Sequence, residues 1–173
     1  MTKKKIDVPD LRLVEGVVAQ RILDAAHTAS KALKKAGIRH VLIGGLAVGA
    51  HGYVRATKDV DFLVGEEGFE HHGGGIITFK PGVPIEVNGV VVDYLEAADE
   101  EDIEPELVSE GIPIVSIEVL IELKLIAHRR QDKLDVVELL HTGSVDEAEV
   151  RAYLEEAAPE LVDRFDALAQ EAE

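Results

Sequence analysis

The chain has 173 residues, with 34 acidic and 18 basic side chains, a formal net charge of −16 and no cysteine. This length fits one domain, and the lack of cysteine excludes a disulfide framework and a thiolate metal site. An extended nucleic-acid groove is not expected, because such grooves are basic, but the docking of one nucleic-acid end stays open.

Membrane association is not expected either. The basic segment 1–7 is not followed by the apolar region of a signal peptide. The longest apolar stretch, residues 41–50, is far shorter than the roughly 20 residues that span a bilayer. We therefore expect a cytoplasmic protein.

The N-terminal half of the chain predicts a helix followed by strands. Apolar residues recur at helical spacing up to Gly37, which is typical of a helix end. The β-branched runs that follow are typical of buried strands. The expected elements are a helix over 10–36, strands over 40–43 and 58–64, a short helix over 46–50, and a glycine-rich loop over 65–75.

The C-terminal half predicts more strands and then helices. Asn88-Gly89 between two apolar runs indicates a two-residue hairpin turn. The expected elements are short strands over 76–79, 83–87 and 112–115, a strand over 90–95, a surface helix or loop over 96–110, and helices beginning at Ser116, Lys133, Ser144 (with Glu147 as a capping box) and Pro159.

This order predicts an α+β fold in which a short mixed β-sheet is flanked by helices and followed by a helical C-terminal tail. We expect one compact domain. It comprises an N-terminal helix (1–37) that packs on the core, a core sheet (38–115) and C-terminal helices (116–173).

Two acidic residues on the second strand are the strongest chemical signal. Asp59 and Asp61 are two positions apart, so both carboxylates lie on one face of the strand. They repel each other unless a cation lies between them, and oxygen ligands of this kind suit Mg²⁺ or Mn²⁺. An isolated Asp-x-Asp can also be a pair of solvated acids at a strand end.

A third carboxylate, Asp93, interrupts an otherwise apolar strand. Burying a lone carboxylate is costly unless something compensates. A third metal ligand, which could also act as the general base, would explain it. The alternative is an Asp that caps a local turn.

Two glycines and a lysine could bind phosphate. Gly44 and Gly45 stand between a strand and a helix, where the backbone can approach a ligand closely, although a tight packing turn is an equal alternative. Lys124 lies off the polar stripe of its predicted helix and so points toward protein, where it needs an anionic partner such as a phosphate or an Asp carboxylate. The alternative is a lysine that reaches out to solvent.

Arg55 and Thr57 lie just ahead of the acidic pair and are candidate nucleotide-binding residues, since a guanidinium can bind a triphosphate. Arg55 could instead pair with Glu66 or Glu67 on the surface. The charged link over 129–135 favours a salt-bridge cluster for its basic residues Arg129, Arg130 and Lys133. The histidines His51, His71 and His72 lack the spacing of a zinc site.

Taken together, these motifs resemble the nucleotidyltransferase superfamily, and most closely its minimal, abortive-infection toxin-like branch. Members carry Gly-Gly or Gly-Ser, then Asp-x-Asp or Asp-x-Glu, then a third acid on a later strand. The resemblance covers roughly residues 38–141, and its segments are Ile43 to Ala47, His51-Gly52, Arg55 to Val64, Val91 to Asp93, Leu123 to Arg130 and Asp132 to Asp135.

The resemblance implies transfer of a nucleoside monophosphate from an NTP to a hydroxyl of an RNA end or a protein, in a toxin-like role. It implies two Mg²⁺ (or Mn²⁺) ions on Asp59, Asp61 and Asp93, with Asp93 also activating the acceptor hydroxyl. It further implies that Gly44 and Gly45 cradle the triphosphate and that Lys124 neutralises it.

A second hypothesis is a catalytically inactive module of the same fold that binds a partner protein, as one subunit of a toxin–antitoxin-type pair. Two departures favour it: residues 65–75 are short where relatives have a full helix, and the chain lacks the large acceptor-binding domain of bigger enzymes. A third hypothesis, a glycosyltransferase with a metal-binding Asp-x-Asp, needs a longer chain.

Overall fold

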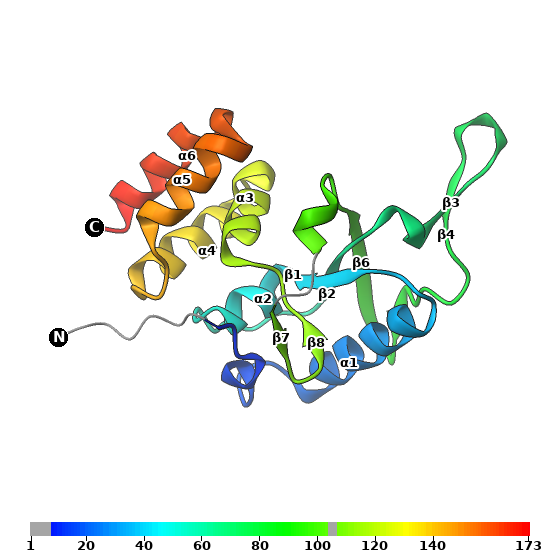
Figure 1. The fold of residues 1–173 in the computed structure, drawn as a ribbon. Coiled ribbons are helices and arrows are strands. Elements are labelled where there is room, and N and C mark those ends of the chain that lie inside the picture. Colours follow the sequence, from blue (N-terminus) through cyan, green and yellow to red (C-terminus); the bar gives the residue numbers. More distant parts are fainter. Residues whose placement is uncertain (1–7, 104–106) are drawn as a thin grey trace.

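The computed structural model describes residues 8–103 and 107–173 (Figure 1). The fold is the expected α+β type, with a small mixed sheet and a helical C-terminal region. Helix α1 lies along one side of the sheet, and helices α3 to α6 gather at one end of the molecule, away from α1 (Figure 1). Residues 1–7, the basic segment at the N-terminus, lie outside the described residues. Residues 104–106, which belong to the surface helix or loop expected over 96–110, also lie outside them.

The central sheet has four strands in the order β1-β2-β6-β5. Strand β2 runs antiparallel to β1 and parallel to β6, and β5 pairs with β6 as a hairpin. The turn of that hairpin is Asn88-Gly89, as predicted, and both residues have positive φ. The strands are β1 His40–Ile43, β2 Val60–Val64, β5 Glu86–Val87 and β6 Val90–Glu96.

One face of this sheet is buried and the other carries the acids. Val60 and Phe62 are fully buried, as predicted from the alternation in β2. The register places Val60 beside Val92, which is also buried, and places Asp61 beside Asp93 on the opposite face. Period-2 alternation in two neighbouring strands therefore brings two carboxylates together.

The predicted helix over 10–36 is wrong in its first third. Residues Leu11–Val14 form a short 3-10 helix, and α1 spans only Gln20–Lys35. Gly16, between them, has φ +82°, a left-handed conformation that an α-helix cannot contain. The short helix α2, Gly44–Ala50, begins two residues earlier than predicted.

The predicted loop over 65–75 is also wrong. Strands β3 (Phe69–His71) and β4 (Ile77–Phe79) pair as a hairpin that projects from the body of the molecule (Figure 1). The predicted strand over 83–87 shortens to β5. Three short 3-10 helices, Glu66–Gly68, Gly73–Gly75 and Glu100–Ile103, and a second small hairpin, β7 (Val108–Ser109) with β8 (Ile112–Pro113), complete this region.

The C-terminal helices follow the predicted order. Ser116 caps α3 through a hydrogen bond from the backbone N–H of Val119, as predicted. The predicted capping box at Ser144 is wrong, because Asp146 caps α5 and the Ser144 hydroxyl instead donates to the carbonyl of His51. The helices are α3 Ile117–Ala127, α4 Arg130–His141, α5 Glu147–Ala157 and, after a 3-10 turn Pro159–Leu161, α6 Val162–Glu171.

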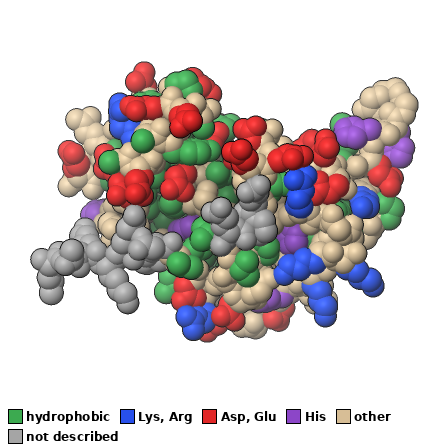
Figure 2. Space-filling model, viewed as in Figure 1, with side chains coloured by type: hydrophobic (Ala, Val, Ile, Leu, Met, Phe, Trp, Pro, Cys, Tyr) green, Lys and Arg blue, Asp and Glu red, His purple; other side chains and the backbone are tan. Residues whose placement is uncertain are grey.

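The apolar residues form two cores that meet at α3. Val119 and Leu120 belong to the larger core, with α1 and the sheet, whereas Ile121 and Leu125 belong to a second core with α4, α5 and α6. Acidic side chains are numerous on the surface of the C-terminal helices (Figure 2). Among the described residues, no helix is both long and apolar enough to cross a membrane.

Candidate active site

A pocket of about 630 Å³ lies between the acidic face of the sheet and helices α3 and α4. This volume is in the range of small-molecule sites. Its wall is built from the end of β1, the start of α2, β2, β6, α3 and the link into α4. All eight residues that the sequence marks for a site line it: Gly44, Gly45, Arg55, Thr57, Asp59, Asp61, Asp93 and Lys124.

The three carboxylates share one side of this pocket. Asp61 and Asp93 are direct neighbours on the parallel strands β2 and β6, and Asp59 precedes β2 by one residue. The expectation that Asp93 is buried is wrong, because its side chain is on the exposed face of β6, between buried Val92 and half-buried Tyr94. An acid is tolerated at position 93 because the side chains of β6 alternate between a buried and an exposed face, and Asp93 is on the exposed one.

Asp61 is the most perturbed of the three. Burial raises the pKa of Asp61 to about 6, and the negative charges of Asp93 and Asp59 add to the shift. Lys124 and Arg129 oppose it. Neighbouring carboxylates that repel one another, one of them half-buried, are typical of a cation site.

The donor set fits a hard divalent cation. Three carboxylates supply oxygen ligands, which Mg²⁺ and Mn²⁺ prefer, and after burial the charges of Asp93 and Asp59 add to the raised pKa of Asp61. Within residues 8–103 and 107–173, no group of three or more acidic or histidine side chains is arranged so that it could hold a metal ion by itself. A cation bound here would take ligands from water and substrate phosphates as well as from the carboxylates, as Mg²⁺ commonly does.

The two glycines make room for site side chains. A Cβ atom on Gly44 would lie 2.2 Å from Oδ2 of Asp61, and φ is +70° there. A Cβ atom on Gly45 would lie 2.8 Å from Oγ1 of Thr57 and 3.1 Å from Nη1 of Arg55. Both glycines are therefore needed for close packing around the pocket.

Basic side chains that line the pocket are bound by carboxylates of helix α4. Arg55 donates from Nε and Nη2 to Asp135, at 2.7 and 2.8 Å, so the alternative pairing with Glu66 or Glu67 is wrong; Glu67 pairs with Arg39. The expectation that Lys124 points inward is confirmed, since its side chain is 10% exposed.

Sequence reasoning missed Asp132 and Asp135 as members of the site. Both are buried, and Nζ of Lys124 lies 3.1 Å from Asp132 and 2.9 Å from Asp135. Burial raises the pKa of each carboxyl, but hydrogen bonds from the neighbouring cations outweigh it, so both pKa values lie below the usual value. The signal in the sequence was their spacing of three, which puts both on one face of a helix.

Arg129 also belongs to the pocket wall. The predicted salt bridge is present, with Nε 2.7 Å from Oδ2 of Asp132, and yet the Arg129 side chain is 78% exposed. Its charge acts on Asp61. The Arg129 guanidinium is therefore bound to Asp132 through Nε, and most of the side chain stays exposed at the pocket wall. Of the histidines, His51 is buried with Nε2 2.7 Å from the carbonyl oxygen of Val115, and His71 and His72 are exposed on the projecting hairpin.

Comparison of the chain with protein-family models and with curated proteins finds no match.

Proposed function

We propose that this protein is a metal-dependent nucleotidyltransferase, which moves a nucleoside monophosphate from an NTP to a hydroxyl of an RNA end or of a protein. The observation that carries the proposal is one pocket whose lining combines the carboxylates Asp59, Asp61 and Asp93 with basic side chains, among them Arg55, Lys124 and Arg129. The carboxylates suit a divalent cation, and the basic side chains suit phosphates. The resemblance to the nucleotidyltransferase superfamily points to the same reaction.

The residues of the pocket have separate roles in this proposal. Asp59, Asp61 and Asp93 hold Mg²⁺ or Mn²⁺, with two ions expected, which would supply charge stabilisation at the reacting phosphate. Arg55, Lys124 and Arg129 line the same pocket and attract the triphosphate. Gly44 and Gly45 keep the backbone close to the acids, and Thr57 packs against Gly45.

Transfer requires one bond to form and one to break. The acceptor oxygen bonds to the α-phosphorus, the bond from that phosphorus to the pyrophosphate oxygen breaks, and pyrophosphate leaves. The acceptor proton passes to a carboxylate, for which we propose Asp93, because it is the exposed one of the two neighbouring strand carboxylates. A cytoplasmic location, where NTP and Mg²⁺ are available, belongs to the proposal.

The test is calorimetric titration of each NTP with Mg²⁺, together with pyrophosphate release on candidate acceptors. We expect wild-type protein to bind an NTP only with the metal, and Asp59→Ala and Asp61→Ala to lose both binding and release. Asp99→Ala, an exposed acid away from the pocket, is the control. Unchanged release in both pocket variants would contradict the proposal. A wild-type chain without NTP affinity would favour the inactive, partner-binding module.

A further inference from the structure

Two buried carboxylates of helix α4, Asp132 and Asp135, hold three of the basic side chains that line the pocket. Asp135 is fully buried and accepts two hydrogen bonds from the Arg55 guanidinium, at 2.7 and 2.8 Å. The same carboxylate lies 2.9 Å from Nζ of Lys124. One side chain thus fixes two cations that belong to different segments of the chain.

Asp132, about a turn before Asp135 in the same helix, holds cations in the same way. Its carboxylate accepts from Nζ of Lys124 at 3.1 Å and from Nε of Arg129 at 2.7 Å. It also accepts from the backbone N–H of Arg129 at 3.1 Å, which caps the start of α4. The start of the helix and the direction of two cations are therefore set by one residue.

We propose that Asp132 and Asp135 are positioning residues, which hold Arg55, Lys124 and Arg129 in the arrangement that binds the phosphates of the substrate. The inference rests on the proposed function and deepens it. Arg and Lys side chains have many rotamers, and fixing them on binding costs affinity. Cations that are already fixed before the substrate arrives avoid that cost.

Charge and position make opposite predictions for the removal of a carboxylate. Asp135→Asn takes one negative charge away from a pocket that binds an anion, so electrostatics alone would tighten phosphate binding. If Asp135 acts by position, the variant releases Arg55 and Lys124 and binding weakens. A general loss of stability does not change the Kd of protein that is still folded.

The experiment is titration of inorganic tripolyphosphate, with Mg²⁺ present, into the full chain. We expect Asp135→Asn to raise the Kd about tenfold or more, as is typical when a side chain that orients a binding group is removed. Thermal unfolding of each variant shows whether it is folded at the titration temperature. If Asp135→Asn does not fold, Asp132→Asn, which releases Lys124 and Arg129, decides the question. A positioning role again predicts a higher Kd, and electrostatics alone again predicts a lower one.

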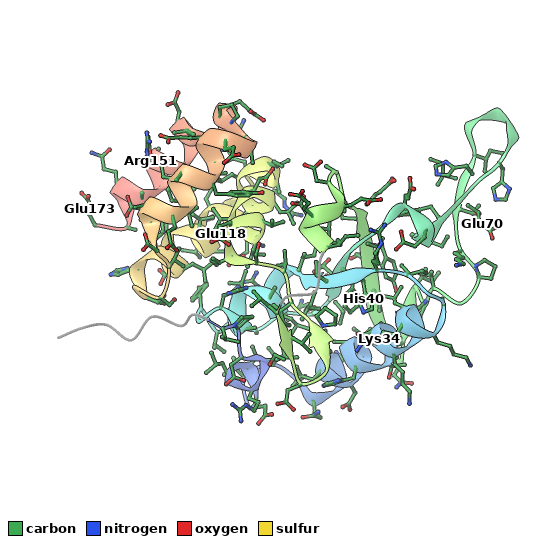
Figure 3. All side chains as sticks on the ribbon, viewed as in Figure 1. Lys34, His40, Glu70, Glu118, Arg151 and Glu173 are labelled. Atoms are coloured by element: carbon green, nitrogen blue, oxygen red, sulfur yellow. The ribbon has the colours of Figure 1, made fainter. Side chains whose placement is uncertain are left out.

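Asp166→Asn is the matched control. Asp166 pairs with Arg151 through the same two guanidinium nitrogens, at 2.9 and 3.0 Å, and neither residue lines the pocket. Arg151 lies among the C-terminal helices (Figure 3). Loss of this pair should leave the Kd within about twofold, as expected for a site that shares no partners with the pocket.

The outcomes separate the two proposals. Weaker binding in the α4 variants, with Asp166→Asn unchanged, supports the positioning role. Unchanged or tighter binding in folded α4 variants overturns the positioning role and leaves the proposed function standing. Wild-type protein that binds neither tripolyphosphate nor an NTP overturns both.

Discussion

Gly44 shows how closely the backbone and the acids of the pocket are packed. An added Cβ would meet Oδ2 of Asp61 at 2.2 Å, in a backbone conformation with φ +70°. We expect Gly44→Ala to lower the free energy of unfolding by about 1–2 kcal/mol through the left-handed backbone. We also expect it to displace the Asp61 carboxylate, so that metal-dependent NTP binding weakens at least about tenfold.

Gly37→Ala is the control for the backbone component of this effect. Gly37 has φ +72°, close to that of Gly44, but an added Cβ there meets nothing within 4 Å. Unfolding monitored by circular dichroism should show the backbone component alone in Gly37→Ala and at least as large a loss of stability in Gly44→Ala, where the contact with Asp61 adds to it. Calorimetry should show a loss of binding in Gly44→Ala alone, and equal binding in the two variants would contradict the role of Gly44 in the pocket.

Asp61 makes the metal response depend on pH. Its pKa in the folded protein is about 6, above the usual value of 3.8. Between these two values the folded state holds more protons than the unfolded state, so without metal the contribution of Asp61 to stability falls as pH rises. Metal binding needs the ionised carboxylate and competes with the proton.

We therefore expect Mg²⁺ to raise the thermal unfolding midpoint more at about pH 7.5 than at about pH 5, on either side of the Asp61 pKa. Asp61→Asn should raise the midpoint of the metal-free protein at the higher pH, because a neutral amide relieves the repulsion by Asp59 and Asp93. The same variant should lose the Mg²⁺ response. Scanning fluorimetry at the two pH values measures both effects, and an equal response to Mg²⁺ at both would contradict the assignment.

Among the elements, helix α5 gives the clearest local test. Asp146 accepts from the backbone N–H of Glu149 at 3.1 Å and so satisfies one free donor of the first turn. We expect Asp146→Ala to cost about 1 kcal/mol. Asp146→Asn keeps the acceptor and should cost much less. Chemical unfolding distinguishes them, and equal losses would show that the charge, not the cap, matters.

Most elements could be predicted from the sequence, because their apolar residues recur with the period of a helix or a strand and are the residues that the fold buries. The strands β1, β2 and β6 carry β-branched runs, and α3 has both a cap and an apolar run. Of the projecting hairpin, β4 was predicted as the strand over 76–79. Its partner β3 was not, since residues 70 to 79 are exposed and show no buried face. The length of α1 could not be predicted either, because Gly16 was the only break in a helical pattern.

The acids of the pocket were easier to recognise in the sequence than the residues that hold its basic side chains. Asp59, Asp61 and Asp93 were recognisable because a carboxylate in an apolar strand is unusual. Asp132 and Asp135 lie in a segment where charges of both signs alternate, and in such a segment the sequence does not show which charges are buried. Arg55, the partner of Asp135, is 80 residues away from it in the chain, so this contact is created only by the fold.

In the whole molecule, the two apolar cores meet along α3, and the pocket lies at their junction. Leu120 packs into the core of the sheet, and Ile121 and Leu125 pack into the C-terminal core. Lys124, between them in sequence, faces the pocket. A helix that belongs to both cores couples them, so the C-terminal helices should unfold together with the sheet.

This coupling predicts that a cavity in either core destabilises the whole chain. Phe165 in α6 and Leu33 in α1 are each fully buried, in different cores. We expect Phe165→Ala to lower the free energy of unfolding by about 3–5 kcal/mol and Leu33→Ala by about 2–5 kcal/mol. Each variant should unfold in a single transition, because α3 contributes residues to both cores and loses its packing on one side when either core opens. Denaturant unfolding, followed by circular dichroism and by tripolyphosphate binding, tests this. An early transition in Phe165→Ala that removes helix signal but leaves binding intact would show that the C-terminal core is independent and that the sheet holds the pocket without it.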